Sequence, residues 1–155
     1  MPVASAARVI SEERLLCTFH VADHFLGLDI AVVQEVLRRQ EITRLPLAAP
    51  AVRGIINLRG SIVPAVDLRR CLALPPAGAD ADPATIVVRH RDETAASLLV
   101  DDVGDVLQVS HATFERAPDT VCGVALALIH GVYPLHDRLL LELDLGEVLR
   151  VAYAL

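Results

Sequence analysis

The sequence predicts an all-β protein with a few short helices, built as two small β-barrels. Short apolar or alternating segments recur along the chain, and clusters of polar residues, glycine or proline separate them. The second half of the chain repeats the pattern of the first half. No long amphipathic helix stands between the strand-like segments, so the pattern favours small barrels and not a parallel βαβ sheet.

The predicted strands are rich in β-branched and aliphatic residues, and turn residues bound them. They cover Leu15–Val21, Phe25–Asp29, Val52–Leu58, Ser61–Val66, Ala84–His90, Ala95–Val100, Val106–Val109, Leu126–Tyr133 and Arg138–Leu143. The first two strands are separated by Ala22-Asp23-His24, and another polar turn falls at Arg91–Thr94. Arg59-Gly60 predicts a tight hairpin turn, because glycine readily adopts a positive φ.

Three aspartates predict short helices, because a carboxylate can accept the free N–H groups of a first helical turn. Asp29 precedes a predicted helix over Ile30–Leu37, with apolar side chains at Ile30, Val33 and Leu37. Asp67 precedes one over Leu68–Leu74, and Asp144 precedes a last helix to about Val151.

An internal repeat supports a duplicated unit. Val52–Leu72 aligns without gaps with Ile129–Leu149 at an offset of 77. The identical pairs are Gly54/Gly131, Leu58/Leu135, Asp67/Asp144, Leu68/Leu145 and Leu72/Leu149. Val33–Leu37 matches Val103–Leu107 at an offset of 70. Two copies cannot form an array, so the repeat indicates a duplication and not a solenoid.

The domain organisation follows from one break in the composition. Pro75–Ala84 (PPAGADADPA) contains no large apolar residue and reads as a linker. We expect residues 1–13 to be a disordered N-terminal tail and residues 14–155 to be a single domain. Its subdomains cover about 15–74 and about 85–150.

Composition excludes several classes of protein. The 155 residues are 54% hydrophobic but only 3% aromatic, which predicts an aliphatic core without stacking platforms for single-stranded nucleic acid. A net charge of -6 argues against any nucleic-acid partner. All 14 basic residues are arginine, so P-loop and Schiff-base mechanisms lack their lysine.

The cysteines and the apolar segments predict a soluble, cytoplasmic protein. Cys17, Cys71 and Cys122 are odd in number and lie in apolar surroundings, which is typical of small buried side chains in a reducing compartment. The N-terminus lacks the apolar stretch of a signal peptide. The longest segment without a charged side chain, Thr120–His136, contains two glycines and a proline, so we expect no direct membrane insertion.

Candidate catalytic and metal sites are incomplete. His20 and His24 flank a predicted turn, where their spacing does not converge them on a metal. Asp101-Asp102 lacks the rest of a phosphorylation site, and Ser61 lies in no nucleophile elbow. We therefore predict neither an enzyme nor a bound cofactor or metal.

Three functions remain open from the residues alone. The first is an adaptor whose surface is its activity. The second is a sensor that binds a small ligand in the aliphatic seam between the two halves. The third is a hydrolase using Asp137 and His136, although neighbouring residues in a turn rarely converge.

Two segments are candidate contact surfaces. Arg59, held at a hairpin tip between Asn57 and Gly60, can offer its planar donors to a carboxylate or carbonyl of a partner. On the predicted helix Ile30–Leu37, Val33 and Val36 cannot both share the inward face, so one of them is expected to reach a surface groove.

The same residues carry a family resemblance. The run Gly54–Leu68 (GIINLRGSIVPAVDL) resembles the signature of the CheW family of bacterial chemotaxis coupling proteins. Val33–Val36 (VQEV), Ile42–Pro46 (ITRLP), Leu98–Val106 and Leu143–Leu145 fit the family's further motifs in order. The resemblance extends over about Leu15 to Leu149.

The resemblance implies a fold and a function. The fold would be two intertwined five-stranded SH3-like barrels with interleaved halves. The function would be to link the cytoplasmic tip of a methyl-accepting chemoreceptor to the regulatory domain of the histidine kinase CheA, at membrane receptor arrays. The implied receptor- and kinase-binding residues are Val33, Glu35, Val36, Asn57, Leu58, Arg59, Gly60, Val100 and Val103.

Overall fold

The computed structural model describes residues 13–91, 95–117 and 125–153. Its elements follow in the order β1 (Glu13–Val21), β2 (His24–Asp29), the 3-10 helix η1 (Ile30–Val32), β3 (Val33–Leu37), β4 (Val52–Leu58), β5 (Ser61–Asp67), α2 (Leu68–Cys71), β6 (Ala84–Val88), β7 (Ala96–Val100), β8 (Asp102–Ser110), η2 (His111–Thr113), η3 (Leu126–Leu128), β9 (Ile129–Pro134), β10 (Leu139–Leu143) and α3 (Leu145–Tyr153). The predicted tail lies, except for Glu13, outside the described residues. None of the described helices is long and apolar enough to span a bilayer.

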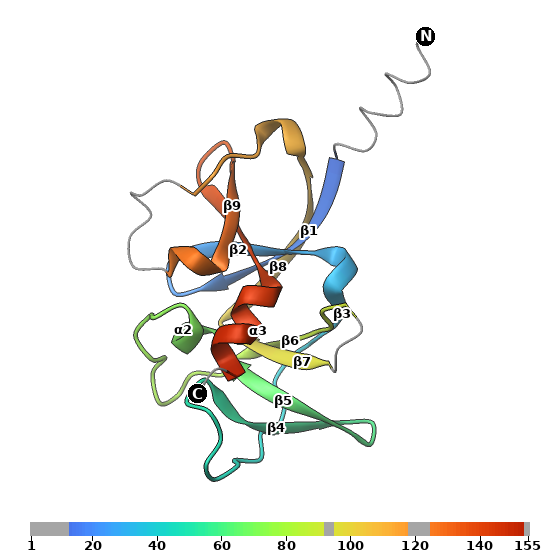
Figure 1. Cartoon of the computed structure of the whole chain (residues 1–155), viewed down its shortest axis with the longest axis vertical. Coiled ribbons are helices and arrows are strands. Elements are labelled where there is room, and N and C mark those ends of the chain that lie inside the picture. Colours follow the sequence, from blue (N-terminus) through green and yellow to red (C-terminus); the bar gives the residue numbers. More distant parts are fainter. Residues whose placement is uncertain (1–12, 92–94, 118–124, 154–155) are drawn as a thin grey trace.

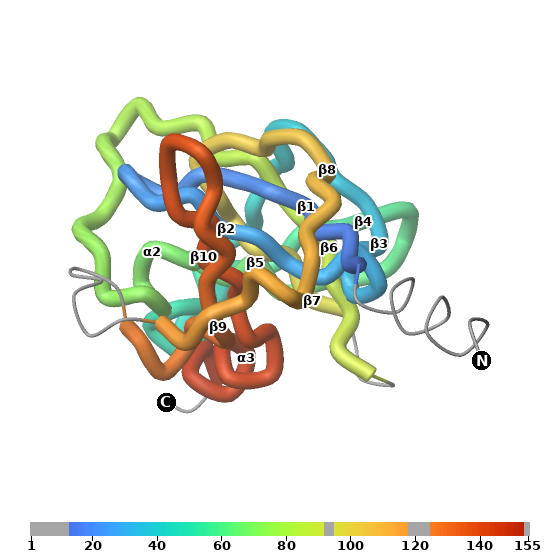
Figure 2. The backbone as a smooth tube through the Cα atoms, turned by 90° about the horizontal axis from the view of Figure 1, so that it is seen from above, coloured from blue at the N-terminus to red at the C-terminus, as the bar shows by residue number. Residues whose placement is uncertain are grey.

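The strands form two five-stranded sheets, which confirms the all-β fold class. Sheet A has the order β8-β1-β2-β10-β9, and sheet B has the order β3-β6-β7-β5-β4. Each sheet therefore takes strands from both sides of the segment 75–84. Figure 1 shows the strands of sheet A above those of sheet B, with α2 and α3 between them. Seen from above, the blue N-terminal strands lie among orange and red segments of the C-terminal half (Figure 2).

A short bridge joins the two edges of each sheet. Beyond β3, Thr43 exchanges two backbone hydrogen bonds of 2.8 and 2.9 Å with Ile55 on β4, the opposite edge of sheet B. Beyond β8, Glu115 makes the equivalent pair of bonds with Val132 on β9, the opposite edge of sheet A. These bridges link the two edges of each sheet, as expected for a sheet that curls toward a barrel, and they satisfy the backbone groups of the bridged residues.

Two glycines allow the bridging segments to approach. A Cβ at Gly54 would lie 2.1 Å from the carbonyl oxygen of Thr43. A Cβ at Gly131 would lie 2.1 Å from the ring of Phe114 and 2.8 Å from the carbonyl oxygen of Glu115. These glycines are the identical pair at the same position of the sequence repeat, so the repeat reflects how both sheets are closed.

The sequence repeat is confirmed element by element. The two aligned segments form β4–β5–α2 and β9–β10–α3. In the shorter sequence match, the first copy forms β3 and the second copy forms part of β8. The sheets also share an unusual parallel contact, β5 with β7 in sheet B and β10 with β2 in sheet A.

The main core lies between the two sheets. It combines buried side chains from both sheets and both helices, including Phe19 on β1, Ile86 on β6, Leu98 on β7, Val132 on β9 and Val148 on α3. Smaller clusters fill the inside of each sheet, around Leu16 and Tyr133 in sheet A and around Ile56 and Val63 in sheet B. The core is aliphatic, as the composition predicts.

The predicted helix over Ile30–Leu37 is wrong in its second part. Asp29 does accept a hydrogen bond from the N–H of Ala31, but the helix ends at Val32. Val33–Leu37 is β3, which pairs antiparallel with β6. Pairing with a distant strand outweighs the local helical pattern, because β-branched residues such as Val33 and Val36 fit a strand better than a helix.

The other predicted elements are present with altered ends. Leu126–Leu128 forms a 3-10 helix ahead of β9, and β8 is longer than the predicted Val106–Val109 because it pairs along much of β1. The N–H groups of Arg70 and Glu147 donate to the Asp67 and Asp144 side chains, which confirms both caps. The turn at Arg59-Gly60 has φ values of +52° and +88°, as a tight hairpin requires.

Candidate binding surfaces

An exposed ion pair stands where the edges of sheet B approach each other. Arg59, in the β4–β5 turn, donates from Nη1 and Nη2 to the two carboxylate oxygens of Glu35 on β3, at 3.0 and 2.9 Å. These hydrogen bonds and the nearby negative charge raise the pKa of Arg59. The side chain of Arg59 is 78% exposed and that of Glu35 27% exposed, so the pair contributes little stability. Its effect is to hold a guanidinium in one orientation at the surface.

The other predicted hairpin residues shape this turn. Asn57 is exposed, and its side-chain oxygen accepts a hydrogen bond of 2.9 Å from the N–H of Gly60. Leu58 is half-buried and packs on the clusters inside sheet B. Gly60 supplies the positive φ. The hairpin residues thus support Arg59, and their own surfaces are small.

A second surface lies between the two sheets. Val36 on β3 and Val103 on β8 line one hollow of about 650 Å³, with Leu37, Arg38, Arg39, Asp82, Pro83, Ala84, Asp101 and Asp102. Val36 is 44% exposed. Because successive residues of a strand point to opposite faces, Val36 and Glu35 lie on opposite sides of β3. The structure therefore divides the predicted residues between two surfaces.

Two predicted residues are not surface contacts of this kind. Val100, on β7, is 1% exposed and belongs to the core between the sheets. Because every residue of β7 is buried, Val100 offers no exposed side chain to a partner in this structure. Val33 is half-buried and packs against the same core.

Sequence reasoning missed two exposed apolar residues on the face of sheet A that carries Val103. Val103 lies opposite Phe19 and Val106 lies opposite Cys17, so both share the face of β1 that also carries Leu15. Leu15 and Val106 are 46% and 49% exposed. Val106 occupies the position of Val36 in the repeat, so the repeat itself contained the signal for this residue.

The rim of the hollow carries free charge. Arg38 is exposed and has no ion-pair partner among the described residues. Asp102 accepts a hydrogen bond from the N–H of Val103 at 3.0 Å. By contrast, Arg39 pairs with Asp82 at 3.2 Å. A basic and an acidic side chain are thus available beside apolar surface.

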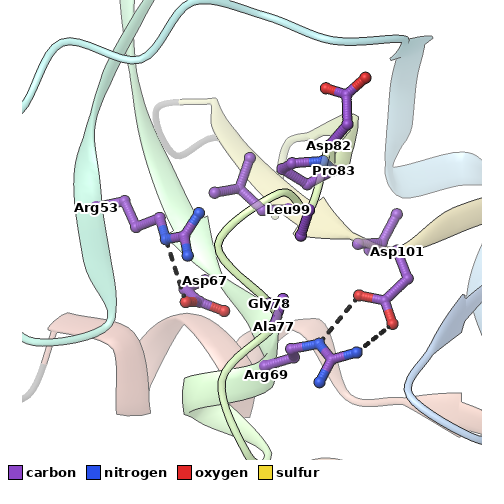
Figure 3. A pocket seen from close by; sticks show the side chains of 11 residues that line it. Arg53, Asp67, Arg69, Ala77, Gly78, Asp82, Pro83, Leu99 and Asp101 are labelled. Carbon is purple, nitrogen blue, oxygen red and sulfur yellow. Dashed lines mark hydrogen bonds and ion pairs between the residues drawn. The ribbon is translucent and has the colours of Figure 1, made fainter.

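A smaller cavity of about 280 Å³ lies behind the segment 77–83. Arg53 pairs with Asp67 at 3.3 Å on one side, and Arg69 pairs with Asp101 at 2.5 Å on the other. Figure 3 shows Leu99 between these ion pairs. Both arginines of the lining are thus paired with aspartates of the lining.

The candidate catalytic and metal-binding residues do not assemble into a centre. Among residues 13–91, 95–117 and 125–153, no three histidine, cysteine or acidic side chains converge on one point. His20 contacts the ring of Phe25 and lies 3.3 Å from Arg138. Cys17 and Cys71 are buried free thiols, as predicted, and burial raises the pKa of both, that of Cys71 to about 11. Cys122 lies outside the described residues.

Comparison with known proteins identifies relatives over nearly the whole chain. A family model for the CheW-like domain matches residues 15–152. The chemotaxis protein CheW of Treponema pallidum is 27% identical over 143 residues, which cover 90% of this chain and 84% of that protein. The chemotaxis protein CheW of Klebsiella aerogenes is 29% identical over 144 residues, covering 93% and 85%. The crystal structure of the scaffolding protein TtCheW from Thermoanaerobacter tengcongensis superposes with a TM-score of 0.76 at 29% identity, covering 84% of this chain and 88% of that one.

Proposed function

Since this chain belongs to the CheW family, a family of chemotaxis scaffold proteins and not of enzymes, we propose that it couples chemoreceptors to the histidine kinase CheA. It acts in the cytoplasm and is recruited to receptor arrays at the membrane. The observation that supports this proposal most is the presence of two separate surfaces, because a coupling protein must hold two partners at the same time.

The hollow between β3 and β8 is assigned to the chemoreceptor tip. An amphipathic helix binds by laying apolar side chains into a groove, while a few polar groups fix its register. Val36, Val103 and Val106 offer the apolar surface. Arg38 and Asp102 offer opposite charges at the rim.

The hairpin end of sheet B is assigned to the regulatory domain of CheA. Arg59 and Glu35 present an ordered charge pair on the other side of β3. Ile62, the second residue of β5, lies opposite Asn57, is 55% exposed and supplies apolar surface at this end of the sheet. An exposed apolar residue next to an oriented arginine is typical of protein–protein contacts.

Single substitutions on the two surfaces test this assignment. Val36→Asp places an unpaired carboxylate in the receptor contact, and a cost of about 2 kcal/mol weakens binding about thirtyfold. We expect it to weaken binding of a purified chemoreceptor cytoplasmic fragment by about this factor and to leave CheA binding unchanged. Arg59→Glu should weaken CheA binding and leave binding of the chemoreceptor fragment unchanged. Both variants should keep the wild-type circular dichroism spectrum.

The matched control is Arg150→Glu, which alters an exposed ion pair on α3 away from both surfaces. It should bind both partners like the wild type. Loss of the same partner in Val36→Asp and Arg59→Glu would contradict two separate surfaces. If the wild type bound neither partner, and a small molecule raised its melting temperature instead, the ligand-sensor hypothesis would replace this proposal.

A further inference from the structure

The chain passes between the two sheets at two places, and an aspartate stands at each. Asp29 is the last residue of β2 in sheet A, and the chain passes from it through η1 into β3 of sheet B. After β7 of sheet B, it enters β8 of sheet A at Asp101. We call these two positions the crossovers. Every other connection in the described part of the chain joins strands of the same sheet.

Several elements hold the Asp101 crossover. Arg69 of α2 donates from Nε and Nη2 to the two carboxylate oxygens of Asp101, at 3.0 and 2.5 Å (Figure 3). The N–H of Ala22 in the β1–β2 turn donates to the same carboxylate at 2.7 Å. The N–H of Asp101 donates to the carbonyl of His20 on β1 at 3.0 Å. The remaining terminal nitrogen of Arg69 donates to the carbonyl of Pro75 at 2.9 Å, so Arg69 connects the crossover to the segment after α2.

The Asp29 crossover is held in a related way. Arg14 of β1 donates to the Asp29 carboxylate at 2.8 Å, and the N–H of Ala31 donates to its other oxygen at 2.9 Å. Glu142 on β10 is 5% exposed and fixes Arg14 through two hydrogen bonds of 2.7 and 2.8 Å. Tyr133 lies 3.2 Å from the same guanidinium. The crossover is thus tied to three strands of sheet A.

The strands that follow the crossovers form the two walls of the hollow. Val36 lies on β3, beyond Asp29, and Val103 lies two residues beyond Asp101. We infer that Arg69 and Arg14 are positioning residues that set the separation of Val36 and Val103. This inference rests on the proposed function only in treating the hollow as the receptor site.

The contacts are suited to fixing geometry. The Arg69–Asp101 pair is partly exposed and adds little to stability, but its bidentate contact has a defined direction. The carboxylate of Glu142, which pairs with Arg14, is buried, so removal of Arg14 would also destabilise the fold. Arg69 is not among the residues of the core between the sheets. Loss of Arg69 therefore frees the crossover without unfolding the domain.

Methyl NMR spectroscopy of the full chain tests the inference without any partner. In Arg69→Ala, the methyl signals of Val36 and Val103 should shift, while those of Leu140, inside sheet A, should remain at their wild-type positions. Arg150→Ala is the matched control, because it removes an arginine–carboxylate pair away from the crossovers. Asp101→Asn is the second variant and replaces Arg69→Ala in the test if that variant fails to fold. Its amide oxygen can still accept the hydrogen bond from the N–H of Ala22.

Binding of a chemoreceptor cytoplasmic fragment provides the second measurement. We expect Kd to rise about tenfold in Arg69→Ala, equivalent to ~1.4 kcal/mol. Arg69→Lys, which restores the charge, should recover part of the affinity. The double variant Arg69→Ala/Asp101→Ala should lose no more than Arg69→Ala alone.

The outcomes separate the two proposals. If Val36 and Val103 keep their wild-type signals in both Arg69→Ala and Asp101→Asn, the positioning role is wrong, whatever the receptor fragment does. If those signals move but the wild type does not bind the fragment, the positioning role stands and the receptor assignment fails.

Discussion

Arg59 combines an unfavourable backbone with a favourable side-chain contact. Its φ of +52° lies in the left-handed region, which asparagine and glycine adopt more easily than arginine. The turn would therefore form at least as well without arginine. The side chain, fixed by Glu35, is what an ordinary turn residue would not supply.

This balance predicts that stability and binding separate at residue 59. Arg59→Asn should leave the melting temperature equal to or higher than that of the wild type, because asparagine suits the first position of this turn. It should weaken CheA binding as Arg59→Glu does. Thermal unfolding and a pull-down with CheA measure the two effects. A melting temperature well below that of the wild type would show that the Glu35 contact outweighs the backbone preference.

Asp101 predicts a defined pH dependence. Partial burial is the largest single influence on its pKa and acts to raise it, but the hydrogen bonds from Arg69 and the N–H of Ala22, together with nearby positive charge, outweigh burial in sum, so the pKa lies below its ordinary value. A group of this kind stabilises the fold above its unfolded-state pKa of about 3.9, and that stability is lost as the pH falls through the folded-state pKa.

Asp101→Asn removes this dependence. The difference in free energy of unfolding between wild type and variant should stay constant from about pH 7 to about pH 5 and shrink below about pH 4. Urea titrations at each pH measure it. A difference that grows on acidification would contradict the assigned direction of the pKa shift.

At the scale of elements, the bridges that close the sheets depend on the absence of a side chain. Gly54→Ala should destabilise the protein by about 2 kcal/mol, since its Cβ would meet backbone atoms of Thr43 and Arg44 that cannot move aside. Gly131→Ala should cost less, because part of the obstacle is the ring of Phe114. Gly78→Ala is the control, with nothing within 4 Å of its Cβ. Equal midpoints in urea for Gly54→Ala and Gly78→Ala would contradict the role of Gly54.

The element scale also shows where sequence reasoning succeeds. Hairpins such as β4–β5 were predictable because their signals are local: alternating apolar residues and a glycine at the turn. β3 was not, because Val33–Leu37 becomes a strand only through pairing with β6. The bounds of β8 depend in the same way on β1.

For the candidate site too, local sequence motifs identified residues, but features that depend on pairing with distant strands could not be predicted. Family motifs identified Arg59, Glu35, Val36 and Val103, all of which lie on or near accessible surface. They could not exclude Val100, whose burial depends on how β7 is enclosed between β6 and β5. They also could not place Glu35 and Val36 on opposite faces, because that requires β3 to be a strand.

At the scale of the whole molecule, each half of the chain contributes one hairpin to the sheet that is built mainly from the other half. The β1–β2 hairpin completes sheet A, whose other strands are β8, β9 and β10, and the β6–β7 hairpin completes sheet B. The core between the sheets then joins both. Neither half of the chain can bury its apolar surface alone.

A chain cut within the segment 75–84 tests this directly. Residues 1–77 and 78–155, produced separately, should each lack the near-native circular dichroism spectrum and cooperative unfolding. Mixed together, they should recover both, because every strand pair becomes available again. A fragment that gave a dispersed NMR spectrum by itself would contradict the exchange. An intact chain cut after purification provides the control for the effect of the cut.

The exchange of hairpins also orders events during synthesis. All strands of sheet B lie within residues 33–100, whereas sheet A needs β10, which ends at Leu143. A ribosome that releases the chain from its N-terminus therefore exposes β1 and β2 first and provides their partners last. Sheet B can assemble once β7 has been made, and the β1 edge can then pair with β8, whereas the β2 edge stays unpaired until β10 has emerged. The β1–β2 hairpin is thus made before every other strand described here but is among the last to complete its pairing, so it is where chaperone protection during translation would matter most.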